Sequence, residues 1–150
     1  MQYRKKLILA SVCIFGSLIG GYVWLWMRMH SATPEEMDIC EAILRRELSD
    51  FGSIPRAQAG VCLRVNGFNP PAALLRRIQE YEPHLLAGSE FRDGWNVLVE
   101  VGPIRKTSEF SAEAFASCYV AGDVGWGRTF MLVRKDGKWI VEHVKLQWVS

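Results

Sequence analysis

The sequence predicts an α+β protein in which a single N-terminal transmembrane helix precedes two helices packed on a four-stranded antiparallel sheet. Three observations lead to this prediction. The stretch Leu7–Met27 is apolar and uncharged, apolar residues then recur at helical spacing after Pro34, and from Trp95 onward they alternate with polar ones. Because helices come before a run of strands, the elements are typical of a layered α+β arrangement and not of a βαβ fold.

The apolar stretch Leu7–Met27 has the length of a membrane anchor. At about 1.5 Å per residue a helix of this length covers roughly 30 Å, the thickness of the hydrocarbon core of a bilayer. The stretch is longer than the apolar region of a secretory signal peptide, and it ends in the bulky, polar sequence Met27–His30 in place of a small-residue cleavage site. We therefore expect an uncleaved anchor.

The charges that flank this stretch predict its orientation. Three basic residues, Arg4–Lys6, precede it and Arg28 follows it, so the N-terminus is expected in the cytoplasm and the remainder in the periplasm or outside the cell. Gly16 and Gly20 have the small-residue spacing of packed membrane helices, which suggests a homo-oligomer formed through this segment. The predicted organisation is 1–6 cytoplasmic, 7–27 transmembrane, 28–33 linker and 34–150 extracytoplasmic domain.

Two helices are predicted at the start of this domain. Thr33 can cap the first helix, Pro34 suits its first turn, and Glu36 completes a capping box. Its apolar side chains recur at helical spacing up to Phe51: Met37, Cys40, Ile43, Leu44, Leu48. The second helix is expected to open at Pro70–Pro71 and to reach about Glu80, with Leu74, Leu75, Ile78 and Tyr81 on its apolar side.

Four segments are predicted to form the sheet. The first ends at Gly102–Pro103, and the Asp-Gly pair at 136–137 is a strong signal for a tight hairpin between the last two. The short segment Val61–Val65 is expected to be extended, and 82–94 is expected to be an irregular connection. The four strands are predicted at Trp95–Val101, Phe110–Ala121, Thr129–Arg134 and Trp139–Val149. The alanines and glutamates of Phe110–Ala121 also suit a helix, but a strand is favoured because Phe115, Tyr119 and the following Gly122–Asp123 suit a meander.

The C-terminal hairpin resembles that of a known superfamily. The segment Gly137–Val141, followed by a long strand that closes at Trp148–Ser150, is similar to the last hairpin of the cystatin-like, nuclear transport factor 2-like superfamily. The resemblance implies a cone-shaped, bent sheet that wraps a long N-terminal helix and encloses a pocket. Several members of the superfamily are isomerases or dehydratases, whereas scaffold subunits of type IV secretion machinery combine such a cone with a single anchor.

Few residues suggest chemistry. The three histidines are isolated and there is no Cys-x-x-Cys motif, so neither a metal nor another cofactor is expected. Period-two alternation places Glu142 in an otherwise apolar row with Ile140, Val144, Leu146 and Trp148, where it is a candidate for a general base with a raised pKa. If the chain has a ligand pocket, Tyr119, Glu142 and His143 are the candidates to line it.

The cysteines and one tryptophan complete the candidate residues. Three cysteines lie outside the anchor, so one disulfide can form, joining Cys62 to Cys118 or to Cys40; the alternative is that they are buried as small hydrophobic side chains. The glycine-rich segment 122–127 precedes a strand and not a helix, which favours a hairpin turn over a phosphate loop. An exposed Trp126 in that turn would be a contact for a protein partner.

Charge and architecture favour an interaction module. When the four basic residues that flank the anchor are left out, the chain has 14 basic and 16 acidic residues. The basic residues form no run, so nucleic acid is not an expected partner. The predicted function is a membrane-anchored, extracytoplasmic protein-interaction module, such as an envelope or secretion-system accessory or an immunity-type protein. The alternative is a membrane-tethered small-ligand-binding protein or pocket enzyme.

Overall fold

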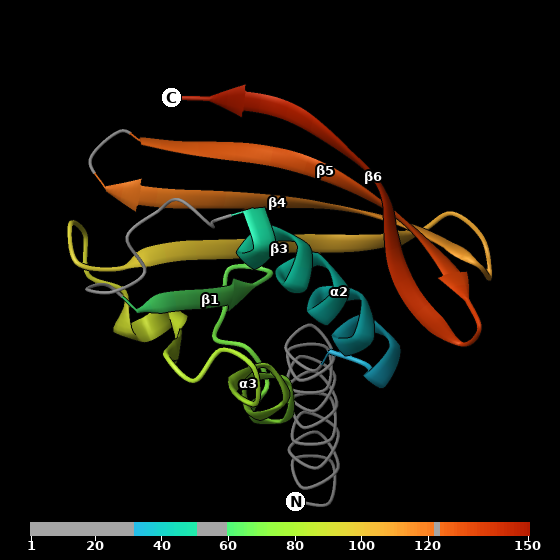
Figure 1. Ribbon diagram of the computed structural model, residues 1–150, viewed down its shortest axis with the longest axis horizontal. Helices are drawn as coiled ribbons and strands as arrows, with labels where there is room; N and C mark the ends of the chain where they lie inside the picture. The colour runs from blue at the N-terminus through green and yellow to red at the C-terminus, as the bar shows by residue number, and fades with distance from the viewer. Residues whose placement is uncertain (1–31, 51–59, 122–123) are drawn as a thin grey trace, which may run out of the picture. The chain divides into compact units, whose positions relative to one another are not determined.

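Six strands form one mixed sheet in the order β2-β1-β3-β4-β5-β6 (Figure 1). The computed structural model describes residues 32–50, 60–121 and 124–150. β1 lies parallel to β2 and to β3, while β3 to β6 form an antiparallel meander. The strands are β1 Val61–Val65, β2 Leu85–Ala87, β3 Val97–Lys106, β4 Ser111–Ala121, β5 Val124–Lys135 and β6 Lys138–Val149.

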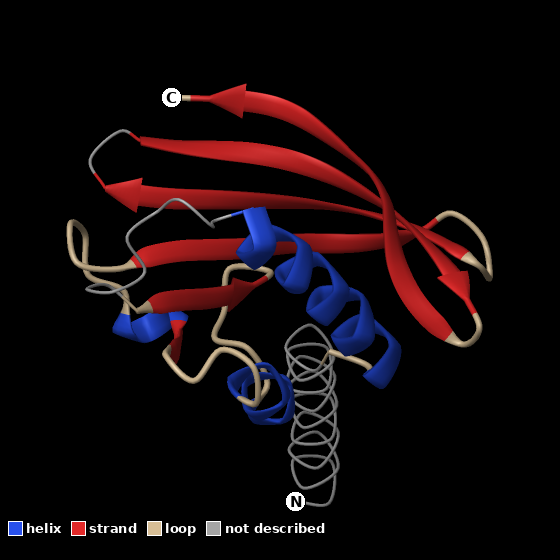
Figure 2. Ribbon diagram, in the orientation of Figure 1, coloured by secondary structure: helices blue, strands red, loops and turns tan. Residues whose placement is uncertain are grey.

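The strands belong to a compact unit, Thr33–Ser150, which also contains two helices. Both helices begin close to the positions that the sequence predicts. They are α2 (Pro34–Asp50) and α3 (Ala72–Gln79), with a 3₁₀ turn η1 (Gly88–Glu90) (Figure 2). The predicted capping box is present at the start of α2. The amide of Thr33 donates to Glu36 Oε2 at 2.7 Å, and the amide of Glu36 donates to Thr33 Oγ1 at 3.2 Å.

The core lies between α2, α3 and one face of the sheet, which we call the inner face. Strand alternation turns every second side chain of the meander toward the helices, and the opposite, outer face carries the others. Phe130 and Leu132 of β5 are fully buried on the inner face. They belong to a cluster that includes Ile39, Ile43, Leu44, Leu74, Ile78, Val99, Val101, Ala114 and Ala116.

The predicted four-stranded antiparallel sheet is wrong, because the sheet has six strands and is mixed. The segment Val61–Val65 is β1, which pairs over its whole length with Val97–Val101 of β3. β2 and η1 occupy the connection that was expected to be irregular. Parallel pairing joins segments that are distant in sequence, so the local pattern around Val61 carries no sign of it.

Two strand boundaries also differ from the prediction. β3 continues past Gly102–Pro103 to Lys106, because a register shift between Val101 and Ile104 accommodates Pro103, which has no amide hydrogen to donate. β5 begins at Val124, so Trp126 lies within the strand and not in a turn.

The transmembrane helix expected from the sequence is not among the helices that the structure describes. In residues 32–50, 60–121 and 124–150, no helix is long and apolar enough to cross a bilayer. The predicted span Leu7–Met27, with Gly16 and Gly20, lies outside the described residues.

Candidate functional site

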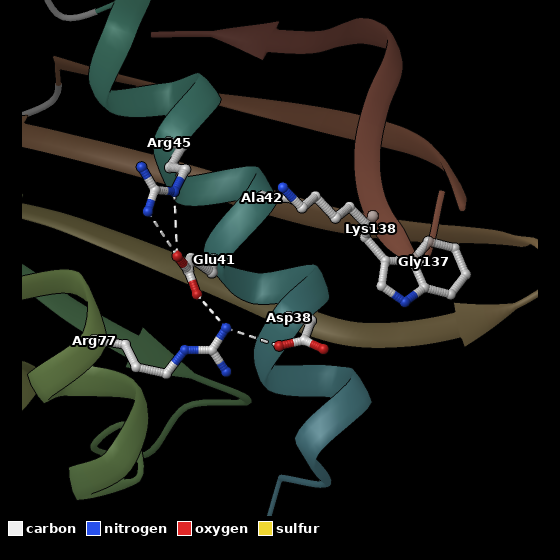
Figure 3. A pocket seen from close by; sticks show the side chains of 8 residues that line it. Asp38, Glu41, Ala42, Arg45, Arg77, Gly137 and Lys138 are labelled. Carbon is white, nitrogen blue, oxygen red and sulfur yellow. Dashed lines mark hydrogen bonds and ion pairs between the residues drawn. The ribbon is translucent and has the colours of Figure 1, made fainter. Parts of the chain in front are cut away.

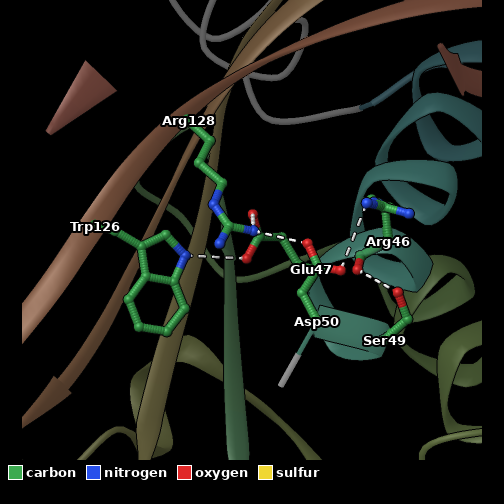
Figure 4. A network of polar contacts seen from close by, with 6 residues as sticks. All are labelled: Arg46, Glu47, Ser49, Asp50, Trp126 and Arg128. Atoms are coloured by element: carbon green, nitrogen blue, oxygen red, sulfur yellow. Dashed lines mark hydrogen bonds and ion pairs between the residues drawn. The ribbon is translucent and has the colours of Figure 1, made fainter. Parts of the chain in front are cut away.

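A buried carboxylate joins the end of α2 to the sheet. The side chain of Glu47 is only 2% exposed. Its Oε2 accepts a hydrogen bond from Trp126 Nε1 at 3.2 Å, and its Oε1 lies 3.3 Å from the guanidinium of Arg128 (Figure 4). The same guanidinium nitrogen lies 3.0 Å from Asp50 Oδ2. The network therefore links the last turn of α2 to the inner face of β5.

Burial raises the pKa of Glu47, and the charge of Arg128 and the hydrogen bond from Trp126 oppose this rise. Two exposed apolar side chains of β6, Leu146 and Val149, lie on the inner face beside the network. Leu146 pairs with Arg128 and Val149 pairs with Trp126. A carboxylate of raised pKa beside apolar surface is an arrangement found at ligand and proton-transfer sites, and also in structural ion pairs.

The pH dependence of stability tests this environment. A carboxyl group whose pKa is raised on folding binds its proton more tightly in the folded state, so its contribution to stability falls as the pH rises from the unfolded value through the folded one. We therefore expect the free energy of unfolding of the Glu47→Gln variant, measured in urea, to rise relative to that of the wild type as the pH is raised from 4 to 7. A difference that is constant with pH, or that changes in the opposite direction, would contradict the raised pKa.

A cleft of about 450 Å³ lies between α2, α3 and the β5–β6 turn (Figure 3). Glu41 binds Arg45 at 2.8 Å and also contacts Arg77, which in turn lies 2.8 Å from Asp38. The guanidinium of Arg45 stacks 3.8 Å from the ring centre of Tyr81. Arg77 of α3 thus pairs with Asp38 and Glu41 of α2, so these charges join the two helices at the wall of the cleft. It is lined by Asp38, Glu41, Ala42, Arg45, Arg77, Gly137, Lys138 and Trp139.

The outer face of β4, β5 and β6 exposes large apolar side chains. Phe115, Met131, Ile140 and Trp148, which we call the outer-face patch, are each 38–45% exposed. The strand registers place them in four neighbouring cross-strand rows on one face, because directly paired residues of antiparallel strands share a face. The rows, from β4 to β6, are Ser117–Gly127–Trp148, Phe115–Thr129–Lys145, Glu113–Met131–His143 and Ser111–Val133–Ile140.

Gly127 leaves room for the two aromatic rings of the patch. A Cβ atom at Gly127 would collide with the indole of Trp148 and with the ring of Phe115. A Cβ at Gly125 would lie 3.6 Å from the same indole. The rings of Trp148 and Phe115 therefore both approach the backbone of Gly127 closely, in the space that a side chain at this position would fill.

The structure does not bring the three pocket candidates together. Tyr119 pairs with Gly125, near the start of β5, whereas His143 pairs with Met131, in the second half of that strand. Six residues of strand separate the two positions, or about 20 Å. Glu142 is exposed and lies 3.2 Å from Lys135 Nζ.

A bulge explains the position of Glu142. The register of β6 shifts beside Met131, where both Glu142 and His143 stand opposite one residue of β5, and it shifts again beside Gly127. The apolar row inferred from period-two alternation is thus divided. Ile140 and Trp148 lie on the outer face, while Val144 lies on the inner face with Phe130.

The remaining predicted residues have other environments. Trp126 is partly buried on the inner face and donates to Glu47, in contrast to the exposed turn position that was expected. Cys40, Cys62 and Cys118 are buried free thiols. Cys62 points to the outer side of β1, away from the core that holds Cys40 and Cys118, so the structure places it next to neither. Burial raises the pKa of Cys40 to about 12.

Sequence reasoning missed Glu47 and Arg128. A signal for Glu47 was present, because it lies three residues after Leu44 and four after Ile43, on the apolar stripe of α2. A carboxylate at such a position needs a buried cation or donor, and Arg128 and Trp126 fill this role from β5.

No protein-family model, curated protein or solved structure matches this chain. The resemblance to the cystatin-like, nuclear transport factor 2-like superfamily therefore stays a prediction. Within the part of the chain that the structure describes, no group of three or more His, Cys, Asp or Glu side chains could hold a metal ion.

Proposed function

We propose that this protein is a protein-interaction module that binds its partner through the outer-face patch. The proposal is supported by the concentration of Phe115, Met131, Ile140 and Trp148 on one face of three strands, opposite the face that α2 covers. Exposed apolar groups that are clustered in this way are typical of interaction sites, and tryptophan is the residue most enriched at energetic centres of interfaces.

The alternative, a small-ligand-binding protein or pocket enzyme, receives less support. Its three candidate residues lie in two places on the sheet, and Glu142 is engaged by Lys135. The specific roles expected from the sequence, an envelope or secretion-system accessory or an immunity-type protein, stay predictions within the interaction proposal.

Two tryptophans provide a matched test of the interaction surface. Trp148 lies in the patch, whereas the strongly exposed Trp95 lies before β3 and outside it. Removal of a central interface tryptophan costs about 2 kcal/mol or more, so Trp148→Ala should weaken recovery of co-purifying proteins by roughly 30-fold. Trp95→Ala should leave it unchanged.

The measurement is quantitative mass spectrometry of proteins recovered with the tagged full-length chain, with circular dichroism to show that both variants are folded. Equal recovery with wild type and Trp148→Ala would contradict the proposal, and so would a loss that Trp95→Ala reproduces.

A further inference from the structure

The outer-face patch has an unbalanced charge beside its aromatic rings. Glu113 is neutralised by Arg105 at 2.6 Å, and Glu142 by Lys135 at 3.2 Å. Lys145 has no carboxylate within ion-pair distance among residues 32–50, 60–121 and 124–150, although it shares a cross-strand row with Phe115. The patch is thus an apolar surface with one uncompensated ammonium group near its centre.

We propose that the partner is a protein whose contact surface places a carboxylate side chain against Lys145 and apolar side chains against Trp148 and Phe115. This inference rests on the proposed function. A partner that covers the two rings also covers the adjacent Lys145, and removal of an ammonium group from water is strongly unfavourable unless an opposite charge is supplied. The carboxylate must come from the partner, since Glu113 and Glu142 are already paired.

The edge of the sheet is a poorer contact than its outer face. β6 is the edge strand of the meander, but its register shifts at two places and it carries Lys138 and Lys145. Bulges and edge lysines disfavour the addition of a further strand. The opposite edge, β2, has only three residues. The partner is therefore expected to pack on side chains of the face and not to extend the sheet.

A second copy of the chain fits this surface less well than an acidic partner. Face-to-face contact of two patches would bring a second Lys145 and no free carboxylate from the outer face of β4 to β6. An anionic lipid surface would select a more uniformly cationic patch than one that contains Glu113 and Glu142.

The test uses a photo-crosslinking amino acid at Ile140, on the rim of the patch, in the full-length chain within its own cells. The expected product is a crosslink to a protein peptide that contains Asp or Glu. Lys145→Glu should reduce its yield by about 10-fold or more, since it places like charges together, and Lys145→Gln should reduce it less. Arg76→Glu, which makes the same charge change on an exposed part of α3, is the matched control and should have no effect.

The decisive result is a charge exchange. Replacement of the crosslinked acidic residue of the partner by lysine should restore the crosslink to the Lys145→Glu chain. A protein crosslink that Lys145→Glu leaves unchanged would overturn the acidic partner while retaining the interaction surface. Crosslinks only to a second copy or to lipid would also overturn it. The absence of any crosslink from Ile140 would overturn both this inference and the proposed function.

Discussion

Replacement of Arg128 with alanine should lower the free energy of unfolding by about 3 kcal/mol at pH 7, because it leaves Glu47 buried without its cation. The carboxylate is 2% exposed, so water cannot solvate it in place of the guanidinium. The same change also removes the contact with Asp50. Urea unfolding followed by far-ultraviolet circular dichroism would measure the loss.

Two further variants define the cause of that loss. The double variant Glu47→Gln, Arg128→Ala should have a higher free energy of unfolding than Arg128→Ala alone, because its buried side chain at position 47 is neutral. Arg105→Ala breaks the exposed ion pair with Glu113 and should change stability by less than about 1 kcal/mol. If Arg128→Ala and Arg105→Ala have equal effects, the Glu47 network does not hold α2 to the sheet.

Replacement of Phe130 with alanine should destabilise the fold by about 4 kcal/mol, because the ring is fully buried and its removal leaves a cavity between α2 and β5. The neighbouring Met131 points to the outer face and is 41% exposed. Met131→Ala should therefore cost less than about 1 kcal/mol.

These adjacent substitutions also test the assignment of faces. Denaturant unfolding of both variants should give a large loss at Phe130 and a small one at Met131. The reverse order would mean that the register of β5 is shifted by one residue, which would place the outer-face patch in the core.

Elements with local signals could be predicted from the sequence. The reciprocal hydrogen bonds of Thr33 and Glu36 depend only on residues within one helical turn. The last hairpin depends on Asp136 and Gly137, whose φ values of 52° and 76° are those that its tight turn requires.

Elements that depend on distant partners could not be predicted in this way. β1 joins the sheet through β3, some 36 positions later, and β2 has only three residues, too few to show a period. The bulges of β6 are equally invisible in the alternation of its residues, so Glu142 was assigned to the wrong row. Glu47 differs from these, because its own helix placed it on a buried stripe.

The mixed topology gives the two halves of the sheet different routes to assembly. The meander from β3 to β6 pairs strands that follow one another in sequence, whereas β1 reaches β3 only after the chain has closed a loop that contains α3. Pairings that close short loops form earlier and at a lower entropic cost than those that close long ones. Phe115, Met131, Ile140 and Trp148 all belong to the half that assembles from sequence neighbours, so the outer-face patch should form before β1 and β2 join the sheet.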